Sequence, residues 1–398
     1  MEEVPVSRFV EFLLRRVGSR GGVEPLAHLE YEEELALKNE ALRDFWKFHQ
    51  LGIEPEPILA SPRPRRYRTT TRRRAQFVGG RLSLGFGQGA GRGESELPPS
   101  ILEPEGHVEI YRFLVEKGNA PANSSVARNL NYLIVRGSYD AFSVVFNMVR
   151  LDGSIVRRLK ILGKQLEESG MSVVSAFVFH DPSRSDYYFE REPPPVSVRL
   201  KKLFGPARLL LRSERGKYLL PPTSFSQVNE SVVPPMLDRI GELLRPAGEE
   251  RLVDLFCGYG LFALALSPDC GEVYGVDANR EAIAAATDSL RFHRPRGKVA
   301  FFDRRITPSA LARILPASGG EELAILDPPR QGVGAELLAY MALRRPRRIA
   351  HIFCGIEAIP GAVATWRENG YRVTRSAPLD MFPGTPNLET LLLLEPVE

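Results

Sequence analysis

The motif DLFCGYG at 254–260 could hold a nucleotide-like ligand, because glycines directly follow an apolar run there. Glycine lets the backbone turn tightly and approach a ligand closely. Nineteen residues after Gly258, the next apolar run ends in Asp277, which could accept hydrogen bonds from ribose hydroxyls. A dinucleotide site would have a third glycine, but Phe262 stands near its place. The pattern favours S-adenosylmethionine over NAD, and a plain tight turn is the alternative.

Cys354 and Glu389 could together perform covalent chemistry. Cys354 follows the apolar run RIAHIF at 348–353, where a parallel strand would open into a ligand crevice. Free cysteines are commonly buried core residues, which is the alternative interpretation. Glu389 opens the last apolar run, so it would lie at the same edge if that strand is antiparallel to the others. A thiolate is a nucleophile and a carboxylate a general base, whereas a lone surface glutamate is the alternative.

The chain has only three cysteines, and they are far apart: Cys257, Cys270 and Cys354. Their odd number and wide spacing support neither a disulfide framework nor a cysteine-rich metal site. An iron–sulfur cluster normally needs four thiolates, which this chain does not have. We therefore predict no metal, and structural roles for Cys257 and Cys270.

A parallel sheet would bring these motifs together. Short apolar runs begin at 252, 273, 299, 323 and 348, and helical stretches such as 280–292 and 335–343 lie between them. Continuous apolar strands that alternate with helices predict an α/β fold with a parallel, Rossmann-like sheet covered on both faces. Two more strands, near 371–376 and 391–394, are expected to complete the sheet.

The first half of the chain has an α+β pattern. We expect a charged amphipathic helix over 28–50, short strands within 66–86, and a proline- and glycine-rich loop over 85–104. Strands are predicted at 132–135, 142–149 and 172–179, and a helix at 154–169. We place one domain boundary near residue 225, which gives an N-terminal α+β substrate-binding domain, 1–225, and a second domain, 226–398.

Seven arginines occur in twelve residues, RPRRYRTTTRRR at 63–74, although the net charge is only +4. Such a run would contribute phosphate contacts on a nucleic acid, and a solvated basic surface is the alternative. Arg72, Arg73 and Arg74 are our candidates for holding the backbone of a nucleic acid. The start of the chain lacks the order of a signal peptide, and no apolar run approaches the roughly 20 residues of a membrane span. We expect a cytoplasmic protein without membrane contact.

Six motifs in order resemble the RNA uridine-5-methyltransferase family over about residues 215–398. They are SFSQVN at 224, DLFCGYG at 254, GVDAN at 275, DPPRQG at 327, the strand ending in Cys354, and DMFPGTPNLE at 380. The resemblance implies a class I methyltransferase fold preceded by an RNA-binding domain. It also implies S-adenosylmethionine as cofactor, and 5-methyluridine in transfer or ribosomal RNA as product.

The resemblance further implies roles for individual residues. Cys354 would be the nucleophile and Glu389 the base. The cofactor site would be lined by Gln227, Phe256, Gly258, Gly260, Asp277 and Asp327. The substrate side would include Phe225, Asn229 and Arg330. Several positions depart from the family pattern. Gly355-Ile356 follow the cysteine where Asn-Pro is usual, and Asn387 stands where His is usual. Phe256 and Asp277 stand where Tyr and Glu are frequent, and Leu261 stands where a small polar residue is frequent.

This chemistry requires a thiolate and a carboxylate, because carbon 5 of uracil is a poor nucleophile. A thiolate that adds to carbon 6 makes carbon 5 reactive, and a base must then remove the carbon 5 proton. We expect the thiol to ionise near neutral pH in a polar or electropositive site, to which Arg330 would contribute. The target base must leave its stack, so RNA loops or single strands are the expected substrates.

Three other functions remain open at this stage. A cytosine-5 methyltransferase usually has a second cysteine in the motif where this chain has Pro328, Pro329 and Arg330. An exocyclic-nitrogen methyltransferase would need no Cys354 and usually has an aromatic residue in place of Arg330. The third is a catalytically weakened RNA-binding protein. In each case we expect RNA as the partner and a monomer without a metal cluster.

Overall fold

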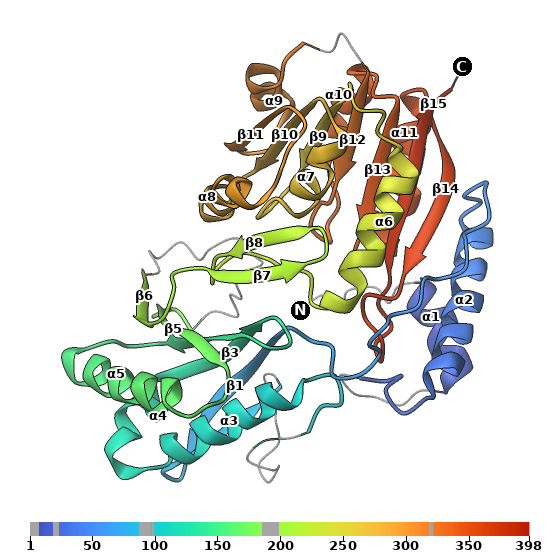
Figure 1. Ribbon diagram of the computed structural model, residues 1–398. Helices are drawn as coiled ribbons and strands as arrows, with labels where there is room; N and C mark the ends of the chain where they lie inside the picture. Colours follow the sequence, from blue (N-terminus) through green and yellow to red (C-terminus); the bar gives the residue numbers. More distant parts are fainter. Residues whose placement is uncertain are drawn as a thin grey trace. The chain divides into compact units, whose positions relative to one another are not determined.

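The protein divides into two units, which Figure 1 shows in a computed structural model. The large unit comprises Met1–Pro64, Arg212–Tyr218 and Ser231–Glu398, and the small unit Arg65–Leu211 and Leu219–Glu230. This division differs from the single boundary predicted near residue 225, because the N-terminal segment belongs with the C-terminal half. The structure describes residues 8–18, 24–86, 97, 99–184, 199–317 and 321–397.

The large unit contains a seven-stranded sheet with the order β11-β10-β9-β12-β13-β15-β14. Strands β9 to β13 are parallel, whereas β15 runs antiparallel to both of its neighbours. The predicted parallel sheet is therefore confirmed, and the last strand is antiparallel, which is the condition on which the expected place of Glu389 depended. The strands are β9 (Arg251–Leu255), β10 (Glu272–Asp277), β11 (Lys298–Asp303), β12 (Glu322–Leu326), β13 (Arg348–Phe353), β14 (Tyr371–Leu379) and β15 (Glu389–Pro396).

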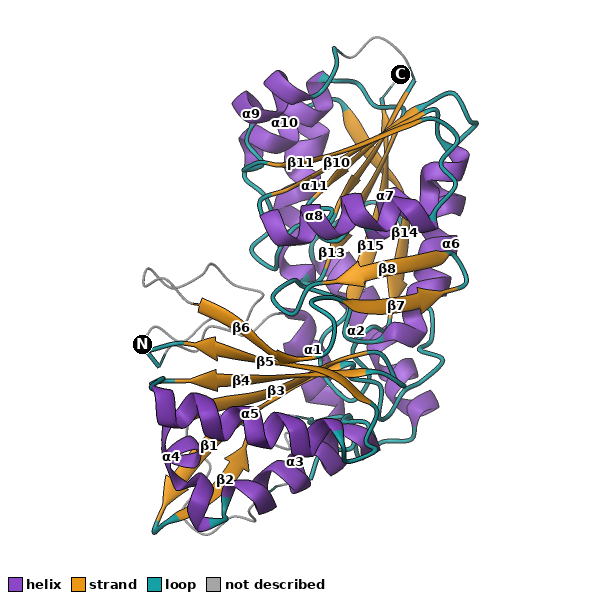
Figure 2. Cartoon of the chain, turned by 60° about the vertical axis from the view of Figure 1, so that its left-hand side comes forward, coloured by secondary structure: helices purple, strands orange, loops and turns teal. Residues whose placement is uncertain are grey.

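Helices cover this sheet on both faces, as Figures 1 and 2 show. On one face, alternate strand residues such as Val253 and Leu326 pack with α9, α10 and α11 in one core. On the other face lie α6 and α7. The helices are α6 (Val233–Leu244), α7 (Leu261–Leu266), α8 (Arg280–Ser289), α9 (Pro308–Ile314), α10 (Ala335–Leu343) and α11 (Ile359–Glu368), with 3-10 turns η2 (Glu230–Val232), η3 (Ser267–Asp269), η4 (Leu290–Phe292) and η5 (Ile356–Ala358).

Two N-terminal helices, α1 (Arg8–Val17) and α2 (Tyr31–Phe48), complete the large unit beside β14 (Figure 1). The helix predicted over 28–50 corresponds to α2. Apolar residues of both helices, among them Leu13 and Phe45, share a core with Phe353 of β13 and with Leu388. Burial of this apolar surface ties the first 64 residues to the C-terminal sheet. A composition change near residue 225 could not reveal such a long-range contact.

The small unit is a six-stranded sheet with the order β2-β1-β3-β4-β5-β6. Its strand pairs are antiparallel except β4 with β5, which α5 connects. The predicted α+β character is confirmed, although most of the predicted loop 85–104 lies outside the described residues. The elements are β1 (Thr70–Val78), β2 (Arg81–Gly85), α3 (Glu105–Gly118), η1 (Pro121–Asn123), α4 (Ser124–Asn129), β3 (Leu130–Gly137), β4 (Phe142–Met148), α5 (Gly153–Glu167), β5 (Val173–His180) and β6 (Arg199–Phe204).

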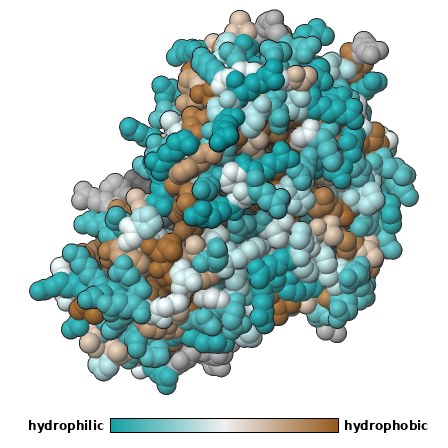
Figure 3. All heavy atoms as spheres, in the orientation of Figure 1, coloured by the Kyte–Doolittle hydropathy of each residue, from teal (hydrophilic) through white to brown (hydrophobic). Residues whose placement is uncertain are grey.

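A short hairpin follows in the chain, made of β7 (Leu209–Ser213) and β8 (Gly216–Leu220). Neither this hairpin nor β6, α1 and α3 was predicted from the sequence. None of the helices in the described part of the chain is long and apolar enough to cross a membrane. The face shown in Figure 3 is mostly hydrophilic, with apolar atoms scattered among polar ones.

Candidate active site

The loop after β9 makes a tight turn at the carboxyl end of the parallel strands. Phe256 has a left-handed backbone with φ of +64°, an uncommon conformation for a residue with a side chain. The N–H groups of Phe256 and Cys257 both donate to the Val276 carbonyl, at 2.9 and 3.2 Å. The Gly258 N–H then donates to Asp277 Oδ2 at 2.9 Å. The predicted loop and the predicted acidic strand end are thus joined directly.

The two glycines of this loop serve different purposes, although both have a positive φ. A Cβ at Gly260 would lie 3.0 Å from the Ala286 Cβ and 3.2 Å from the Phe301 ring. The absence of a side chain therefore lets α8 and β11 pack closely against this loop. No heavy atom lies within 4 Å of the position that a Gly258 Cβ would take. Gly258 therefore faces open space, as expected of backbone that a ligand approaches.

Asp254 is a site residue that sequence reasoning missed. It is fully buried, and its Oδ2 accepts a hydrogen bond from the Ala263 N–H at 2.9 Å. Its Oδ1 has no hydrogen-bond partner within the described part of the chain. Burial raises the pKa of Asp254 well above its usual value, and the nearby Asp327 and Asp277 raise it further. The only sequence signal was a carboxylate inside the strand that leads into the glycine loop.

Asp277 and Asp327 complete a cluster of three carboxyl groups at this edge. Asp327 directly follows β12, the strand between β9 and β13. Burial and the charge of Asp277 raise the pKa of Asp327 to about 7. Burial likewise raises the pKa of Asp277, although N–H groups of the loop oppose this shift. Carboxylates this close favour a positively charged ligand and would repel a pyrophosphate.

Cys354 and Glu389 lie side by side at the end of neighbouring strands. In the antiparallel pair β13 and β15, Phe353 is opposite Thr390, and the two site residues come directly next to that pair. Glu389 is only 1% exposed, whereas Cys354 is partly exposed. Burial and the charge of Asp327 raise the pKa of Glu389 well above its usual value, while Arg330 lowers it. The structure therefore connects the reactive pair electrostatically to the carboxylate cluster.

The surroundings of Cys354 differ from the electropositive site that was predicted. Burial, then Glu389 and Asp327, raise the pKa of the Cys354 thiol to about 12. Arg330 lowers that pKa, in the direction predicted, but does not outweigh the carboxylates. Without a ligand the sulfur is therefore a protonated thiol. Cys257 and Cys270 are buried, also with raised pKa values, in keeping with the structural roles expected of them.

The departures at Asn387 and Gly355 fit the local structure. Asn387 accepts a hydrogen bond from Arg330 Nη2 at 3.4 Å and donates one to Thr385 Oγ1 at 3.1 Å. Gly355 has an extended backbone, with φ of −145°. A side chain there would make ordinary contacts, 3.5 Å from Glu357 Oε2 and 3.7 Å from the Arg330 carbonyl. Glycine at 355 is therefore not required by the backbone.

The motif SFSQVN forms a well-anchored segment of the small unit. The Thr69 N–H donates to the Val228 carbonyl at 2.8 Å, and the Tyr139 hydroxyl donates to Asn229 Oδ1 at 3.3 Å. Asn229 is fully buried and Gln227 is 8% exposed, whereas the ring of Phe225 is 45% exposed. Asn229 thus holds the segment in place instead of facing a substrate, and Phe225 is the member that faces outward. The predicted cofactor contact of Gln227 stays a prediction.

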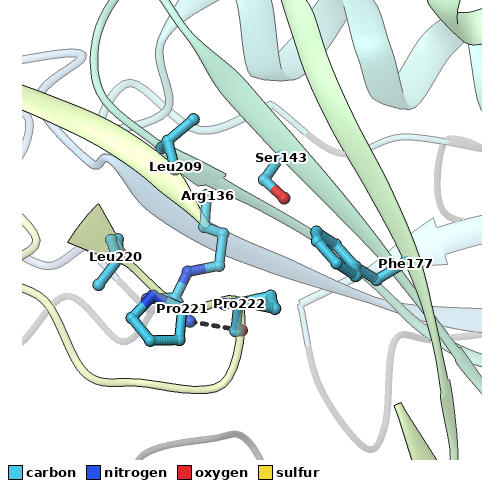
Figure 4. A pocket seen from close by; sticks show the side chains of 7 residues that line it. All are labelled: Arg136, Ser143, Phe177, Leu209, Leu220, Pro221 and Pro222. Carbon is cyan, nitrogen blue, oxygen red and sulfur yellow. Dashed lines mark hydrogen bonds between the residues drawn. The ribbon is translucent and has the colours of Figure 1, made fainter. Parts of the chain in front are cut away.

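A buried arginine anchors the start of that segment. Arg136 of β3 donates from Nη1 to the Pro222 carbonyl at 2.8 Å, and from Nη2 to the Ser224 carbonyl. Figure 4 shows the crevice at this place, with the arginine pointing to the proline. The crevice is lined by Arg136, Ser143, Phe177, Leu209, Leu220, Pro221 and Pro222. Sequence reasoning did not identify Arg136, since it lies far from the arginine run.

The three arginines predicted to bind RNA separate onto two faces of β1, because side chains alternate along a strand. Arg73 is 1% exposed and forms an ion pair with Glu103, with Nη2 2.5 Å from Oε2. Its charge is already used within the fold, so the prediction of an RNA contact is corrected here. Arg72 and Arg74 lie on the other face and stack over the Tyr132 ring, at 5.0 and 5.2 Å.

No group of histidine, cysteine and acidic side chains in the described residues could hold a metal ion. The site therefore consists of a glycine loop, a carboxylate cluster, and a thiol beside a buried carboxyl group. The donor set fits S-adenosylmethionine, which has a sulfonium and an ammonium group to meet the carboxylates. Gly258, Asp277 and Asp327 are the residues that would hold it.

Comparisons with known proteins relate the chain to RNA methyltransferases. The family model for tRNA (uracil-5-)-methyltransferase matches residues 198–294. An uncharacterized RNA methyltransferase of Clostridium tetani is 25% identical over 94% of this chain and 80% of its own. The 23S rRNA (uracil(1939)-C(5))-methyltransferase RlmD of Alkalilimnicola ehrlichii is 28% identical over 93% of this chain and 79% of its own.

The fold is shared with a solved structure. The tRNA (uracil-54, C5)-methyltransferase of Pyrococcus abyssi, in complex with S-adenosyl-L-homocysteine, matches with a TM-score of 0.70 and 21% identity. The match covers 94% of this chain and 85% of that one, which confirms the predicted class I methyltransferase fold. These findings also confirm the resemblance that the motifs indicated: the chain is a relative of the RNA uracil-5-methyltransferases.

Proposed function

We propose that this protein transfers a methyl group from S-adenosylmethionine to carbon 5 of a uridine in RNA, through a covalent adduct with Cys354. The observation that carries the proposal is the placement of Cys354 next to the buried Glu389, at the sheet edge where Asp327 and the glycine loop also lie. A nucleophile and a base beside a nucleoside site are what this reaction requires.

The residues of the cofactor site fit this assignment. Asp277 Oδ2 accepts from Gly258 and Oδ1 from the Asn279 N–H at 2.7 Å, so the carboxylate is fixed in place. Each carboxylate oxygen can accept a second hydrogen bond, which leaves capacity for ribose hydroxyls. The cofactor, when bound, supplies an electrophilic methyl group on a positively charged sulfur. Asp327 is placed to balance that positive charge.

Cys354 and Glu389 then divide the chemistry between them. The Cys354 thiolate forms a bond to carbon 6 of the uracil, and carbon 5 gains the electron pair that takes the methyl group. Glu389 in its ionised form removes the carbon 5 proton. The electrons of that C–H bond form the C5–C6 double bond, the C6–S bond breaks, and the thiolate leaves.

The state of the thiol links cofactor binding to reactivity. Because Glu389 and Asp327 raise the pKa of Cys354, positive charge brought beside these carboxylates lowers it again. Arg330 acts in the same direction. We therefore expect Cys354 to stay unreactive in the empty enzyme and to ionise when the site is filled. Such gating would protect the sulfur from reacting with other electrophiles.

For RNA recognition, the small unit offers an aromatic ring and two arginines. Phe225 is 45% exposed on a segment that is otherwise buried, which suits stacking on an unpaired base. Arg72 and Arg74 share a face with Tyr132 and could contact phosphates. Similar proteins are named for transfer RNA or for ribosomal RNA, so both are candidate substrates. That the protein acts as a monomer stays a prediction.

The test is to incubate the protein with unmodified tRNA and rRNA and with S-adenosylmethionine that has a deuterated methyl group. Mass spectrometry of the digested RNA should find labelled 5-methyluridine. Labelled 5-methylcytidine or an N-methylated purine would contradict the uridine assignment. A Glu389→Gln variant should accumulate a covalent protein–RNA adduct, because the carbon 5 proton stays in place. No label from any RNA, with the cofactor bound, would favour a catalytically weakened RNA-binding protein.

A further inference from the structure

The N-terminal helix α2 carries two buried charges that the reaction described above does not use. Lys38 is 0% exposed, and its Nζ lies 2.8 Å from Glu34 Oε1 and 2.9 Å from Asp380 Oδ1. Glu34 and Asp380 are also fully buried. Burying three charges is costly unless each is well paired, and apolar residues would pack a helix at less cost. The cluster therefore calls for an explanation other than stability.

These charges hold the loop between β14 and β15. The Gly384 N–H donates to Glu34 Oε1 at 2.6 Å, and the Leu26 N–H donates to the Gly384 carbonyl at 3.1 Å. The Tyr31 hydroxyl donates to Asp380 Oδ2 at 3.2 Å and accepts from the Ser61 N–H at 2.6 Å. The N-terminal segment thus binds the loop at its first residue, Asp380, and at Gly384 in its middle.

This loop leads directly to the catalytic base. It begins after Leu379, the last residue of β14, which is paired with Glu389 in the sheet. Leu388, which precedes Glu389, and Phe353, which precedes Cys354, pack into one core with residues of α1 and α2. The same helices therefore support the residue before the nucleophile and the residue before the base.

A second contact fixes the strand on which the loop begins. Residues 56–59 run along the outer edge of β14, where Glu56 N–H donates to the Ser376 carbonyl and Leu59 N–H to the Pro378 carbonyl, both at 2.9 Å. The Asp380 N–H donates back to the Leu59 carbonyl at 3.0 Å. Asp380 is therefore held by its backbone as well as by Lys38.

We propose that Lys38 is a positioning residue, which acts through Asp380 and Glu34 to hold the loop 380–388 so that the Glu389 carboxylate meets the carbon 5 proton. This inference rests on the proposed function. The step it concerns is the last one: the carboxylate takes the proton, the C–H electrons form the C5–C6 double bond, and the C6–S bond to Cys354 breaks. Formation of the adduct and methyl transfer precede it and do not need Glu389 as a base.

The experiment compares Lys38→Met with the wild-type protein in a single turnover. The probe is an end-labelled transcript of an RNA that the wild type methylates, mixed with S-adenosylmethionine and quenched in denaturant. A displacement of about 1 Å at a reacting group can lower a rate by about 10²-fold. We therefore expect turnover to fall by 10- to 100-fold, while the covalent adduct, seen on a denaturing gel, accumulates above its wild-type level. The measurement is made at a temperature where thermal unfolding shows the variant to be folded.

A merely structural role for Lys38 predicts a different pattern. Loss of folded enzyme would lower the adduct, the transferred methyl groups and the turnover in equal proportion. Tyr31→Phe is a milder variant, which removes the hydroxyl contacts to Asp380 and to the Ser61 N–H and leaves the three charges in place. It should accumulate the adduct in the same way, to a smaller extent. If turnover and adduct level in both folded variants equal those of the wild type, the proposal is wrong.

The control is Arg16→Met, on α1. Arg16 is partly exposed and pairs with Glu40 and Asp44 of α2, so its loss loosens the two helices without touching the loop. It should behave as the wild type. Wild-type methylation and trapping by Glu389→Gln are measured in parallel. If both are absent, the proposed function fails. If both are present but Lys38→Met and Tyr31→Phe behave as the wild type, the positioning role alone fails.

Discussion

Buried carboxylates at the two ends of the seven-stranded sheet have neighbours of opposite charge. At the end where β12 begins, Glu322 is 1% exposed and is bound by Arg344, with Nη2 at 2.5 Å and Nε at 2.9 Å. Arg251 lies 3.6 Å from the same carboxylate. At the end where β12 stops, burial and the charge of Asp277 raise the pKa of Asp327 to about 7.

This difference separates structural charges from functional ones. A buried carboxylate that is paired with a cation has its charge balanced within the fold and does not attract a cationic ligand. A group of carboxylates that repel one another stores electrostatic free energy, which a cationic ligand can release on binding. Ligand sites at the carboxyl ends of parallel strands are general in such sheets, and here the charge pattern marks which end is used.

The largest effect is expected at the reactive end, from Cys354→Ala. In other enzymes, removing a covalent nucleophile can lower turnover about 10⁶-fold. We expect the turnover of this variant to fall below the detection limit. The unfolding free energy should change little, because the side chain is small and partly exposed. Transfer of labelled methyl groups to RNA, together with urea unfolding, measures both. Wild-type turnover in this variant would contradict the covalent mechanism.

A matched pair of substitutions on β12 and just after it tests the comparison directly. Glu322→Gln leaves the buried Arg344 without its counter-charge and should lower the unfolding free energy by about 3–5 kcal/mol. Asp327→Asn removes a charge that its neighbours oppose, so at pH 8 stability should be unchanged or higher, while cofactor affinity falls. Urea unfolding and calorimetric titration with S-adenosylmethionine measure the two effects. Equal destabilisation by both variants would show that the two ends do not differ.

Sequence reasoning located the sheet, and placed Cys354 and Glu389 at one edge of it, because the signals for both are local. Apolar runs mark the strands, and Cys354 and Glu389 stand where a run ends or begins. Two kinds of feature could not be predicted in this way. Pairing between distant segments, such as Lys38 with Asp380 or Arg73 with Glu103, leaves no pattern in a single sequence. Electrostatic surroundings also depend on such pairing, which is why the acidic site around Cys354 was not foreseen.

The pH dependence of cofactor binding should reveal the unsatisfied cluster. The pKa of Asp327 is about 7 in the empty protein, so its carboxyl group is mostly neutral at pH 6 and mostly ionised at pH 8. A cationic ligand binds the ionised form, and affinity should therefore fall as pH decreases. We expect S-adenosylmethionine to bind about tenfold more weakly at pH 6 than at pH 8.

Asp277, Asp254 and Glu389 also have raised pKa values, and the charge of Arg330 acts on Glu389 in the opposite direction. Their titration can widen the pH range of the effect but not change its direction, because each gains negative charge as pH rises. Asp327→Asn is the control and should flatten the dependence. An affinity that is constant or greater at pH 6 in the wild type would contradict the role given to the cluster.

The smallest effect tests the same distinction in the small unit, where Arg73 is buried in an ion pair and Arg72 and Arg74 lie on the opposite face of β1. Arg72→Ala and Arg74→Ala should each weaken RNA binding and lower the slope of log affinity against log salt by about 0.7 to 1. Arg157→Ala, on helix α5, is the exposed control and should leave the slope unchanged. Arg73→Ala should instead destabilise the fold, because Glu103 would be left buried without its partner. Arg73→Ala could instead stay folded and lower the slope as much as Arg72→Ala and Arg74→Ala do. The charge of Arg73 would then be available to RNA, and burial in an ion pair would not distinguish structural from binding arginines on β1.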